Sequence, residues 1–246
     1  MKVVLITGAT SGVGFETAKL FSSEKNTKVI SLSVDLNKIN LAKRALPKVE
    51  FLQCDVTDYC ALLKITEIID KKYGKIDVLV NNAGTIIQGN IETLAVEDWD
   101  KVIKNNFSSY YYVTKALLPL LKKGENANIV NISSISATVG GSSIAYSCSK
   151  AGVNMISQSL AKDLAKYKIR VNTISPGMFN SGFHVHNNIM TEKQYDDMLK
   201  KQSTNYPFGI GTSLDIANAI LFISSEKAKW ITGANLLVDG GNLANK

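Results

Sequence analysis

Tyr146 and Lys150 are the pair of residues in this sequence best suited to acid/base chemistry. They lie four positions apart in a segment whose apolar spacing predicts a helix, so both side chains project from one face about one turn apart. A phenol with a pKa of about 10 is a poor base at neutral pH, but a neighbouring ammonium group favours the phenolate. Tyr146 could then exchange a proton with a substrate oxygen. The alternative is a tyrosine that only packs against the helix surface.

A glycine-rich segment, residues 7–14, is the second candidate site. It follows an apolar run and precedes a predicted helix from Val13, and in that context glycines let the backbone approach a pyrophosphate. The helix N-terminus then supplies hydrogen-bond donors. Such a turn can also serve structure alone. The candidate phosphate-binding residues are Gly8, Thr10, Ser11, Gly12, Val13 and Gly14.

The elements that must position these residues alternate along the chain. Short β-branched runs predict strands at residues 3–6, 29–32, 49–52, 76–80, 129–132, 171–174 and 235–238. Segments with apolar residues at every third or fourth position predict helices at 61–73, 96–106, 110–123, 146–167 and 214–224. The alternation predicts an α/β fold: a Rossmann-like, doubly wound parallel sheet with helices on both faces. No repeat or linker divides the sequence, so residues 1–246 are predicted to form a single domain.

Residues 179–206 interrupt the alternation. The segment is polar, contains both histidines of the chain and follows the strand predicted at 171–174. Ligands of open α/β sheets bind beyond the carboxyl ends of the strands, so this segment is predicted to be a substrate lid. The alternative is a surface helical excursion without function. His184 and His186 have no acidic or cysteine partner at metal-binding spacing, and no metal site is predicted.

Composition and charge restrict the class of protein. Hydrophobic residues make up 45% and charged residues 20% of the chain, which is typical of a folded domain with a substantial core. The net charge of +7 suits contact with phosphates, but the lysines form no basic stripe, so no nucleic-acid partner is predicted. The three cysteines lack paired spacing, and the N-terminal apolar run is too short for a signal peptide or a membrane span. We expect a cytoplasmic protein with no membrane partner.

Several motifs, in order, resemble those of the classical short-chain dehydrogenase/reductase family. Residues 7–14 have the form TGxxxGxG, Asn81-Asn82-Ala83-Gly84 is similar to the family's NNAG element, and residues 146–150 resemble its YxxxK motif. Residues 231–233 and 238–241 resemble the last strand and its flanks, so the similarity spans nearly the whole chain. The resemblance implies an oxidoreductase that transfers a hydride between a nicotinamide cofactor and a carbonyl or secondary alcohol.

The resemblance also implies a role for each catalytic residue. Tyr146 would donate or accept the proton, and Lys150 would bind the nicotinamide ribose and lower the pKa of the tyrosine. Ser134, at the end of the strand predicted at 129–132, would orient the substrate oxygen. Ser133 is the alternative, because it restores the usual family spacing to the tyrosine. Asn106 would bind, through its backbone carbonyl, a water that links the lysine to solvent, although the neighbouring asparagine at 105 leaves its register open.

Cofactor selectivity depends on the residue after the second strand. NAD is usually selected by an acidic residue there, and Ser33 takes that position. A serine hydroxyl can donate to a 2′-phosphate, which favours NADP(H) over NAD(H), although Asp35 could still reach the ribose. The other cofactor contacts implied by the resemblance are Asp55, Val56, Asn82, Ala83, Gly84, Tyr146, Lys150, Pro176, Gly177 and Ser181.

Substrate and assembly are less constrained. Within the family, a 3-oxoacyl-[acyl-carrier-protein] reductase and a sugar, polyol or alcohol dehydrogenase both fit. A catalytically silent dinucleotide-sensing or scaffolding protein is the alternative, and the intact serine, tyrosine and lysine argue against it.

The run of tyrosines at 110–112 is predicted to face a core or a subunit contact. Because family members commonly pair this helix and the helix of Tyr146 in a dimer interface, the resemblance implies a homotetramer or a homodimer.

Overall fold

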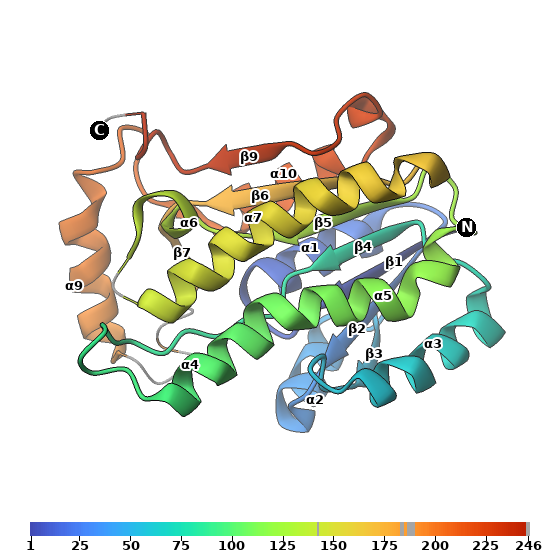
Figure 1. Cartoon of the computed structure of the whole chain (residues 1–246), viewed down its shortest axis with the longest axis horizontal. Helices are drawn as coiled ribbons and strands as arrows, with labels where there is room; N and C mark the ends of the chain where they lie inside the picture. The colour runs from blue at the N-terminus through green and yellow to red at the C-terminus, as the bar shows by residue number, and fades with distance from the viewer. Residues whose placement is uncertain (142, 183–184, 186–189, 245–246) are drawn as a thin grey trace.

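Seven parallel strands lie in the order β3-β2-β1-β4-β5-β6-β9 in the computed structural model, which describes residues 1–141, 143–182, 185 and 190–244 (Figure 1). All seven predicted strands are confirmed, and so is the doubly wound parallel sheet. The order reverses between β1 and β4, the position at which open α/β sheets bind ligands. The strands are β1 (Lys2–Thr7), β2 (Thr27–Ser33), β3 (Glu50–Gln53), β4 (Val78–Asn81), β5 (Asn128–Ile132), β6 (Arg170–Pro176) and β9 (Asn235–Val238).

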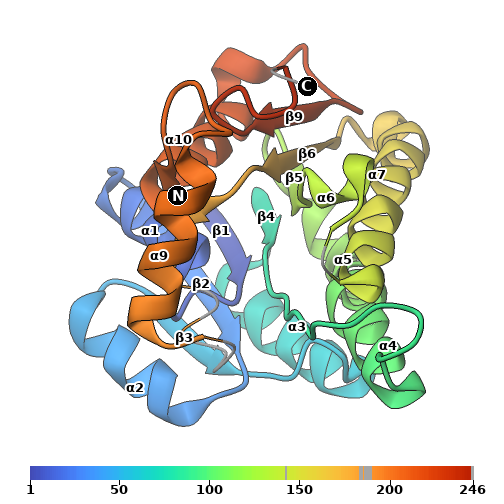
Figure 2. The same cartoon turned by 90° about the vertical axis from the view of Figure 1, so that its left-hand side faces the viewer.

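Helices cover both faces of the sheet (Figure 2). One face packs against α1 (Gly12–Ser23), α2 (Leu36–Ala45) and α10 (Ser213–Ile223), and the other against α3 (Tyr59–Tyr73), α5 (Ser109–Leu121) and α7 (Ile144–Leu164). In β1, Val4 and Ile6 point to the first face and Val3 and Leu5 to the second. Burial on both faces explains why the strands read as continuous apolar runs.

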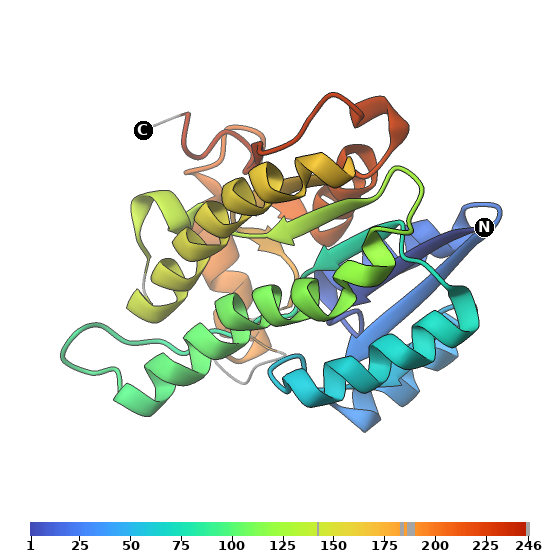
Figure 3. The same ribbon diagram turned by 45° about the vertical axis from the view of Figure 1, so that its right-hand side comes forward.

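The helix that leads into α5 differs from the prediction. The sequence pattern suggested separate helices at 96–106 and 110–123, but α4 (Val96–Ile103) continues through a π-helical turn, η1 (Lys104–Ser108), directly into α5 (Figure 3). No glycine or proline lies between residues 96 and 110 to end the helix. The π turn contains Asn106, and such turns occur frequently at functional sites.

Two phenols fix the start of the predicted lid. There, β7 (Phe179–Asn180) pairs with β8 (Gly211–Thr212), and α9 (Glu192–Ser203) contributes Tyr195. The Tyr195 hydroxyl accepts from the Ser181 N–H at 3.1 Å and donates to the Phe179 carbonyl at 3.2 Å. The Tyr206 hydroxyl accepts from the Met178 N–H at 2.8 Å. These bonds attach α9 and the segment after it to the end of β6.

The remaining elements are short: α6 (Ser136–Val139) and the 3-10 turns η2 (Ala165–Tyr167) and η3 (Glu226–Ala228). His184 and His186 lie outside the described residues. Within the described ranges, three or more His, Cys, Asp or Glu side chains never gather at one point as metal ligands would. In that same part of the chain, none of the helices combines the length and apolar character needed to cross a bilayer.

Candidate active site

A cavity of about 480 Å³ lies at the carboxyl ends of the strands, where the sheet order reverses. Segments far apart in the sequence meet there, including the glycine-rich segment, the end of β4 and the start of α7. Gly14 and Asn106 are the two predicted site residues that do not line it. Those that do are Gly8, Thr10, Ser11, Gly12, Val13, Ser33, Asp55, Val56, Asn82, Ala83, Gly84, Ser134, Tyr146, Lys150, Pro176, Gly177 and Ser181.

Thr7 links the glycine-rich segment to the end of β4. Its hydroxyl oxygen accepts from the backbone N–H groups of Asn82 at 2.9 Å and Ala83 at 3.0 Å. The Asn82 side chain in turn donates to the Thr7 and Gly8 carbonyls at 2.9 and 3.1 Å. A Cβ on Gly14 would lie 2.4 Å from the Gly8 oxygen, so this glycine permits the close approach without itself facing the cavity. The sequence pattern had not singled out Thr7 as a site residue.

The first turn of α1 faces the cavity, and its backbone N–H groups can donate hydrogen bonds to a ligand. Gly8 and Gly12 have φ values of +72° and +56°, which side chains rarely adopt, and they turn the chain from β1 into the helix. The N-cap residue, Ser11, makes no side-chain capping bond to the first turn. The amide groups of that turn can therefore bind an anion such as a pyrophosphate.

The β2 end of the cavity, lined by Ser33, Asp35, Lys38 and Asp55, carries both signs of charge. The Asp35 carboxylate caps α2 by accepting from the Asn37 and Lys38 N–H groups at 2.8 and 3.1 Å. Lys38 was missed from the sequence because it lies in α2, a helix that was itself missed. The Asp35 oxygen that caps α2 is committed to the protein, whereas Lys38 is exposed and lines the same cavity as Ser33.

Lys150 lies at the base of the Tyr146 end of the cavity. Its buried ammonium donates to the Ile132 carbonyl at 2.7 Å and lies 5.6 Å from the centre of the Tyr146 ring. The Tyr110 hydroxyl donates to the same carbonyl at 3.1 Å and lies 3.5 Å from the lysine nitrogen. The tyrosines of the run at 110–112 therefore differ in environment, because Tyr110 is buried next to the site and Tyr111 is exposed.

Burial dominates the acid–base properties of this pair. Burial raises the pKa of Tyr146 to about 12, opposed by a hydrogen bond with Ser134. Burial also lowers the pKa of Lys150 to about 7. Burial alone therefore raises the pKa of the phenol, and the expectation that Lys150 lowers it stays a prediction for the protein with cofactor bound. Near neutral pH, Tyr146 is a neutral phenol, the form that can donate a proton to a carbonyl oxygen.

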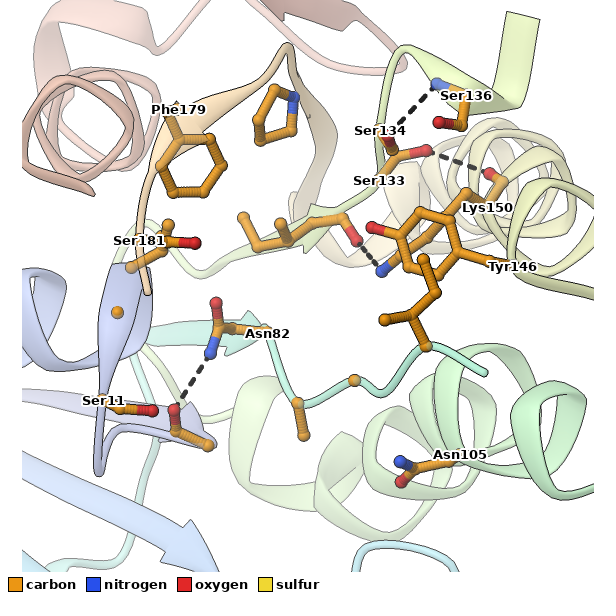
Figure 4. A pocket seen from close by; sticks show the side chains of 18 of the residues that line it. Ser11, Asn82, Asn105, Ser133, Ser134, Ser136, Tyr146, Lys150, Phe179 and Ser181 are labelled. Carbon is orange, nitrogen blue, oxygen red and sulfur yellow. Dashed lines mark hydrogen bonds between the residues drawn. The ribbon is translucent and has the colours of Figure 1, made fainter. Parts of the chain in front are cut away.

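The two adjacent serines have different partners (Figure 4). Ser133 is buried, and its hydroxyl donates to the Lys150 backbone carbonyl at 3.0 Å. The Ser134 hydroxyl oxygen accepts from the Ser136 N–H at 3.1 Å, and Ser134 lies close enough to the Tyr146 phenol to lower its pKa. Ser133 therefore fastens β5 to α7, and Ser134 is the serine whose hydroxyl meets the phenol in the cavity.

Asn106 lies behind the cavity wall in the π turn. Its side chain accepts from the Thr85 N–H and donates to the Thr85 carbonyl, both at 2.7 Å. A Cβ on Gly84 would lie 3.4 Å from the Asn106 side-chain oxygen and 3.8 Å from the Lys150 nitrogen, so Gly84 separates the two. Asn105, the other possible register, lines the cavity itself.

A family model described as short chain dehydrogenase matches residues 2–192. The chain belongs to the short chain dehydrogenase family. This membership makes it an NAD(P)-dependent oxidoreductase acting on CH–OH or carbonyl groups, and it does not favour the catalytically silent alternative.

Similar members of the short chain dehydrogenase family cover almost all of the chain. The 3-oxoacyl-[acyl-carrier-protein] reductase FabG of Thermotoga maritima is 37% identical, over 98% of this chain and 97% of its own length. The NADP-dependent (R)-specific alcohol dehydrogenase of Lentilactobacillus kefiri is 31% identical, over 99% and 97%. The ligand-free aldohexose dehydrogenase of Thermoplasma acidophilum is 31% identical, with a TM-score of 0.89 over 99% of this chain and 94% of that one.

Proposed function

We propose that this oxidoreductase interconverts a carbonyl and a secondary alcohol with Tyr146 as acid/base, Ser134 as the residue that orients the substrate oxygen, and NADP(H) as the preferred cofactor. The observation that carries the proposal is the contact between the Tyr146 and Ser134 side chains, with the buried Lys150 ammonium beneath them. Both hydroxyls lie in the same cavity as the glycine-rich segment.

The side chains divide the work of carbonyl reduction. Ser134 and Tyr146 donate hydrogen bonds to the substrate oxygen, and Tyr146 passes its proton to that oxygen as negative charge develops. Lys150, close beneath the ring, favours the phenolate that remains. When bound, the nicotinamide supplies the hydride in this direction and accepts it in the reverse one. Asn106 and Gly84 fix the wall on the other side of the lysine.

A single-turnover assay tests the proposal as a whole. The purified protein is mixed with NADPH or NADH and a panel of ketones, 3-oxoacyl thioesters and oxidised sugars, and the nicotinamide absorbance is followed. Turnover of any carbonyl supports the reaction. Tight nucleotide binding without turnover across the panel would contradict it and favour a silent sensor.

Ser134→Ala should lower kcat by about 10²-fold, because a donor to the developing oxyanion is lost. Ser133→Ala removes the bond to the Lys150 carbonyl instead, so it should cost about 1 kcal/mol of unfolding free energy and affect kcat much less. Steady-state rates and urea unfolding of both variants measure the contrast. If Ser133→Ala shows the larger loss of kcat, the assignment of the two serines is reversed.

The preference for NADP(H) is supported by the β2 end of the cavity. Ser33 offers a hydroxyl where an acidic residue would select NAD, and Lys38, which lines the same cavity, supplies an exposed cation for a 2′-phosphate. Asp35, the residue that could still bind the ribose, already uses its Oδ1 oxygen to accept two bonds from the start of α2.

Lys38→Gln should weaken NADPH binding by about 10-fold while changing NADH binding by less than about two-fold, since only NADPH carries the 2′-phosphate. Lys43→Gln, an exposed lysine on the same helix, is the matched control. Titration calorimetry with both cofactors measures the affinities. Equal losses for the two cofactors, or tighter binding of NADH by the wild type, would contradict the preference.

We also propose that copies of the chain assemble as a homodimer or homotetramer through the face formed by α4, α5 and α7, which lie side by side (Figure 1). Val96, Tyr111 and Met155 are exposed on these helices, and a second copy would remove them from water. Wild-type protein should sediment above the monomer mass of 26.7 kDa, and Met155→Glu should sediment as a smaller species. Leu41→Glu, on the distant α2, is the control. A monomeric wild type would contradict the proposal.

The cytoplasmic location and the lid at residues 179–206 stay predictions.

The relatives act on different classes of compound, so they do not identify the substrate of this protein. An acidic carrier protein would be expected to meet exposed cations, and two charged side chains near the end of α5 already have partners within the protein. Lys122 lies 4.0 Å from the centre of the Tyr167 ring, and Glu125 pairs with Lys75 at 2.7 Å. The residues that line the cavity are therefore better evidence for the class of substrate than the charged residues at the surface.

A further inference from the structure

Two serine hydroxyls beside Tyr146 have no part in the mechanism above. Ser147 follows the tyrosine on α7, Ser136 begins α6, and both line the cavity. A Cβ on Gly141 would lie 3.1 Å from the Ser136 oxygen and 3.3 Å from the Ser147 oxygen. The two hydroxyls therefore converge on one point, and the glycine keeps the space at that point open.

Both hydroxyls have hydrogen-bonding capacity that the protein does not use. The Ser147 oxygen is buried, and across the described residues it has no hydrogen-bond partner. Ser136 bonds to Ser134 through its backbone N–H, and its hydroxyl makes no bond within the same part of the chain. By contrast Ser143, on the same wall, donates to the Ile87 carbonyl at 2.6 Å. A ligand oxygen that pairs with a buried, unpaired hydroxyl removes its desolvation cost.

The Tyr146 end of the cavity is otherwise uncharged and partly apolar. Within the described ranges, Lys150 is the only charged residue that lines this end, and the others line the β2 end. Those others are Asp35, Lys38 and Asp55. Phe179 lies across the cavity from Ser134 and Tyr146 (Figure 4). This combination suits a neutral molecule with oxygens along one edge and C–H groups along the other.

We propose that Ser136 and Ser147 bind a second substrate oxygen, on the carbon next to the reacting carbon. The substrate class is then the neutral vicinal diols and their α-hydroxy ketones, which include polyols and sugars. This inference rests on the proposed function, because Tyr146 and Ser134 still bind the reacting oxygen. In reduction the carbonyl carbon of the hydroxy ketone takes a hydride from NADPH, its C=O bond becomes a C–O single bond, and the neutral Tyr146 phenol gives its proton to that oxygen, which leaves the diol, NADP⁺ and the Tyr146 phenolate.

Matched substrate pairs test the inference, since the members of each pair differ only by the neighbouring hydroxyl. Suitable pairs are 3-hydroxybutan-2-one with butan-2-one, and 2-hydroxycyclohexanone with cyclohexanone, each reduced with NADPH. The wild type should prefer the hydroxylated member by about 10- to 100-fold in kcat/KM, the range expected for one or two hydrogen bonds to a buried hydroxyl.

Ser147→Ala and Ser136→Ala should each reduce this preference by about 5- to 10-fold, and the double variant should bring it close to one. The readout is the ratio of kcat/KM values within a pair, which a general loss of folding or cofactor binding does not change. Ser159→Ala is the control, because this serine is exposed on α7 and its hydroxyl donates to the Met155 carbonyl of its own helix.

The outcomes separate the two claims. A wild-type ratio near one, or a ratio that both alanine variants leave unchanged, overturns the inference and leaves the proposed function standing. Turnover of 3-oxoacyl thioesters with none of the pairs also overturns the inference. Failure of every carbonyl with either cofactor, while nucleotide binding persists, overturns the proposed function itself.

Discussion

Tyr146→Phe should lower single-turnover reduction by about 10³-fold while NADPH binding changes by less than about two-fold. The substitution removes the hydroxyl and keeps the ring that covers Lys150, so the change acts on proton transfer more than on packing. The buried phenol has its pKa raised to about 12, which keeps the proton available for donation throughout the neutral range. Stopped-flow absorbance of NADPH with saturating carbonyl, together with calorimetric binding of NADPH, measures the two quantities.

Tyr111→Phe is the matched control, because Tyr111 is exposed on α5 and lies outside the cavity. It should react at the wild-type rate. A Tyr146→Phe variant that retained more than about a tenth of the wild-type rate would show that another group donates the proton. Ser134 would then be the first residue to examine, since its hydroxyl shares the cavity with the phenol.

The fold could be predicted because every strand of the sheet is buried on both faces. Burial of this kind demands continuous apolar runs such as Val3 to Ile6, and helices of ordinary length must connect parallel strands. The helix α2 was missed for the opposite reason. Only Ile39 and Ala42 of its ten residues are buried, while Leu36 and Leu41 are exposed, so the apolar residues of this short segment do not mark one buried face.

The candidate site was recognisable where chemistry demands a fixed spacing, as for Tyr146 and Lys150 on one helix. Site residues were harder to predict from the sequence where their contacts join segments that are distant along the chain. Nothing local to Ser133 and Ser134 reveals which hydroxyl turns toward α7 and which enters the cavity. The pKa direction of Tyr146 also depends on how many segments exclude water from it, and this is a property of the assembled fold.

Lys150→Met should reduce turnover by about 10²- to 10³-fold and also remove one pH-dependent contribution to stability. Burial lowers the pKa of Lys150 to about 7 in the folded protein, against about 10.5 when unfolded. Below pH 7 both states bind the proton, and the cost of burying the charge is present in full. Between pH 7 and 10 the folded state has released the proton and the unfolded state keeps it, so wild-type stability rises with pH.

The free energy of unfolding of the wild type, minus that of Lys150→Met, should therefore increase by about 3 kcal/mol between pH 6.5 and 9.5. Urea unfolding at several pH values measures it, with Lys162→Met, an exposed lysine on the same helix, as control. Above pH 10 the raised pKa of Tyr146 acts in the opposite direction, because the unfolded state then loses the phenolic proton first. A difference that stays flat from pH 6.5 to 9.5 would mean that the 2.7 Å bond to the Ile132 carbonyl suffices to keep the buried ammonium charged. Lys150 would then favour the Tyr146 phenolate throughout this pH range, without any help from the cofactor.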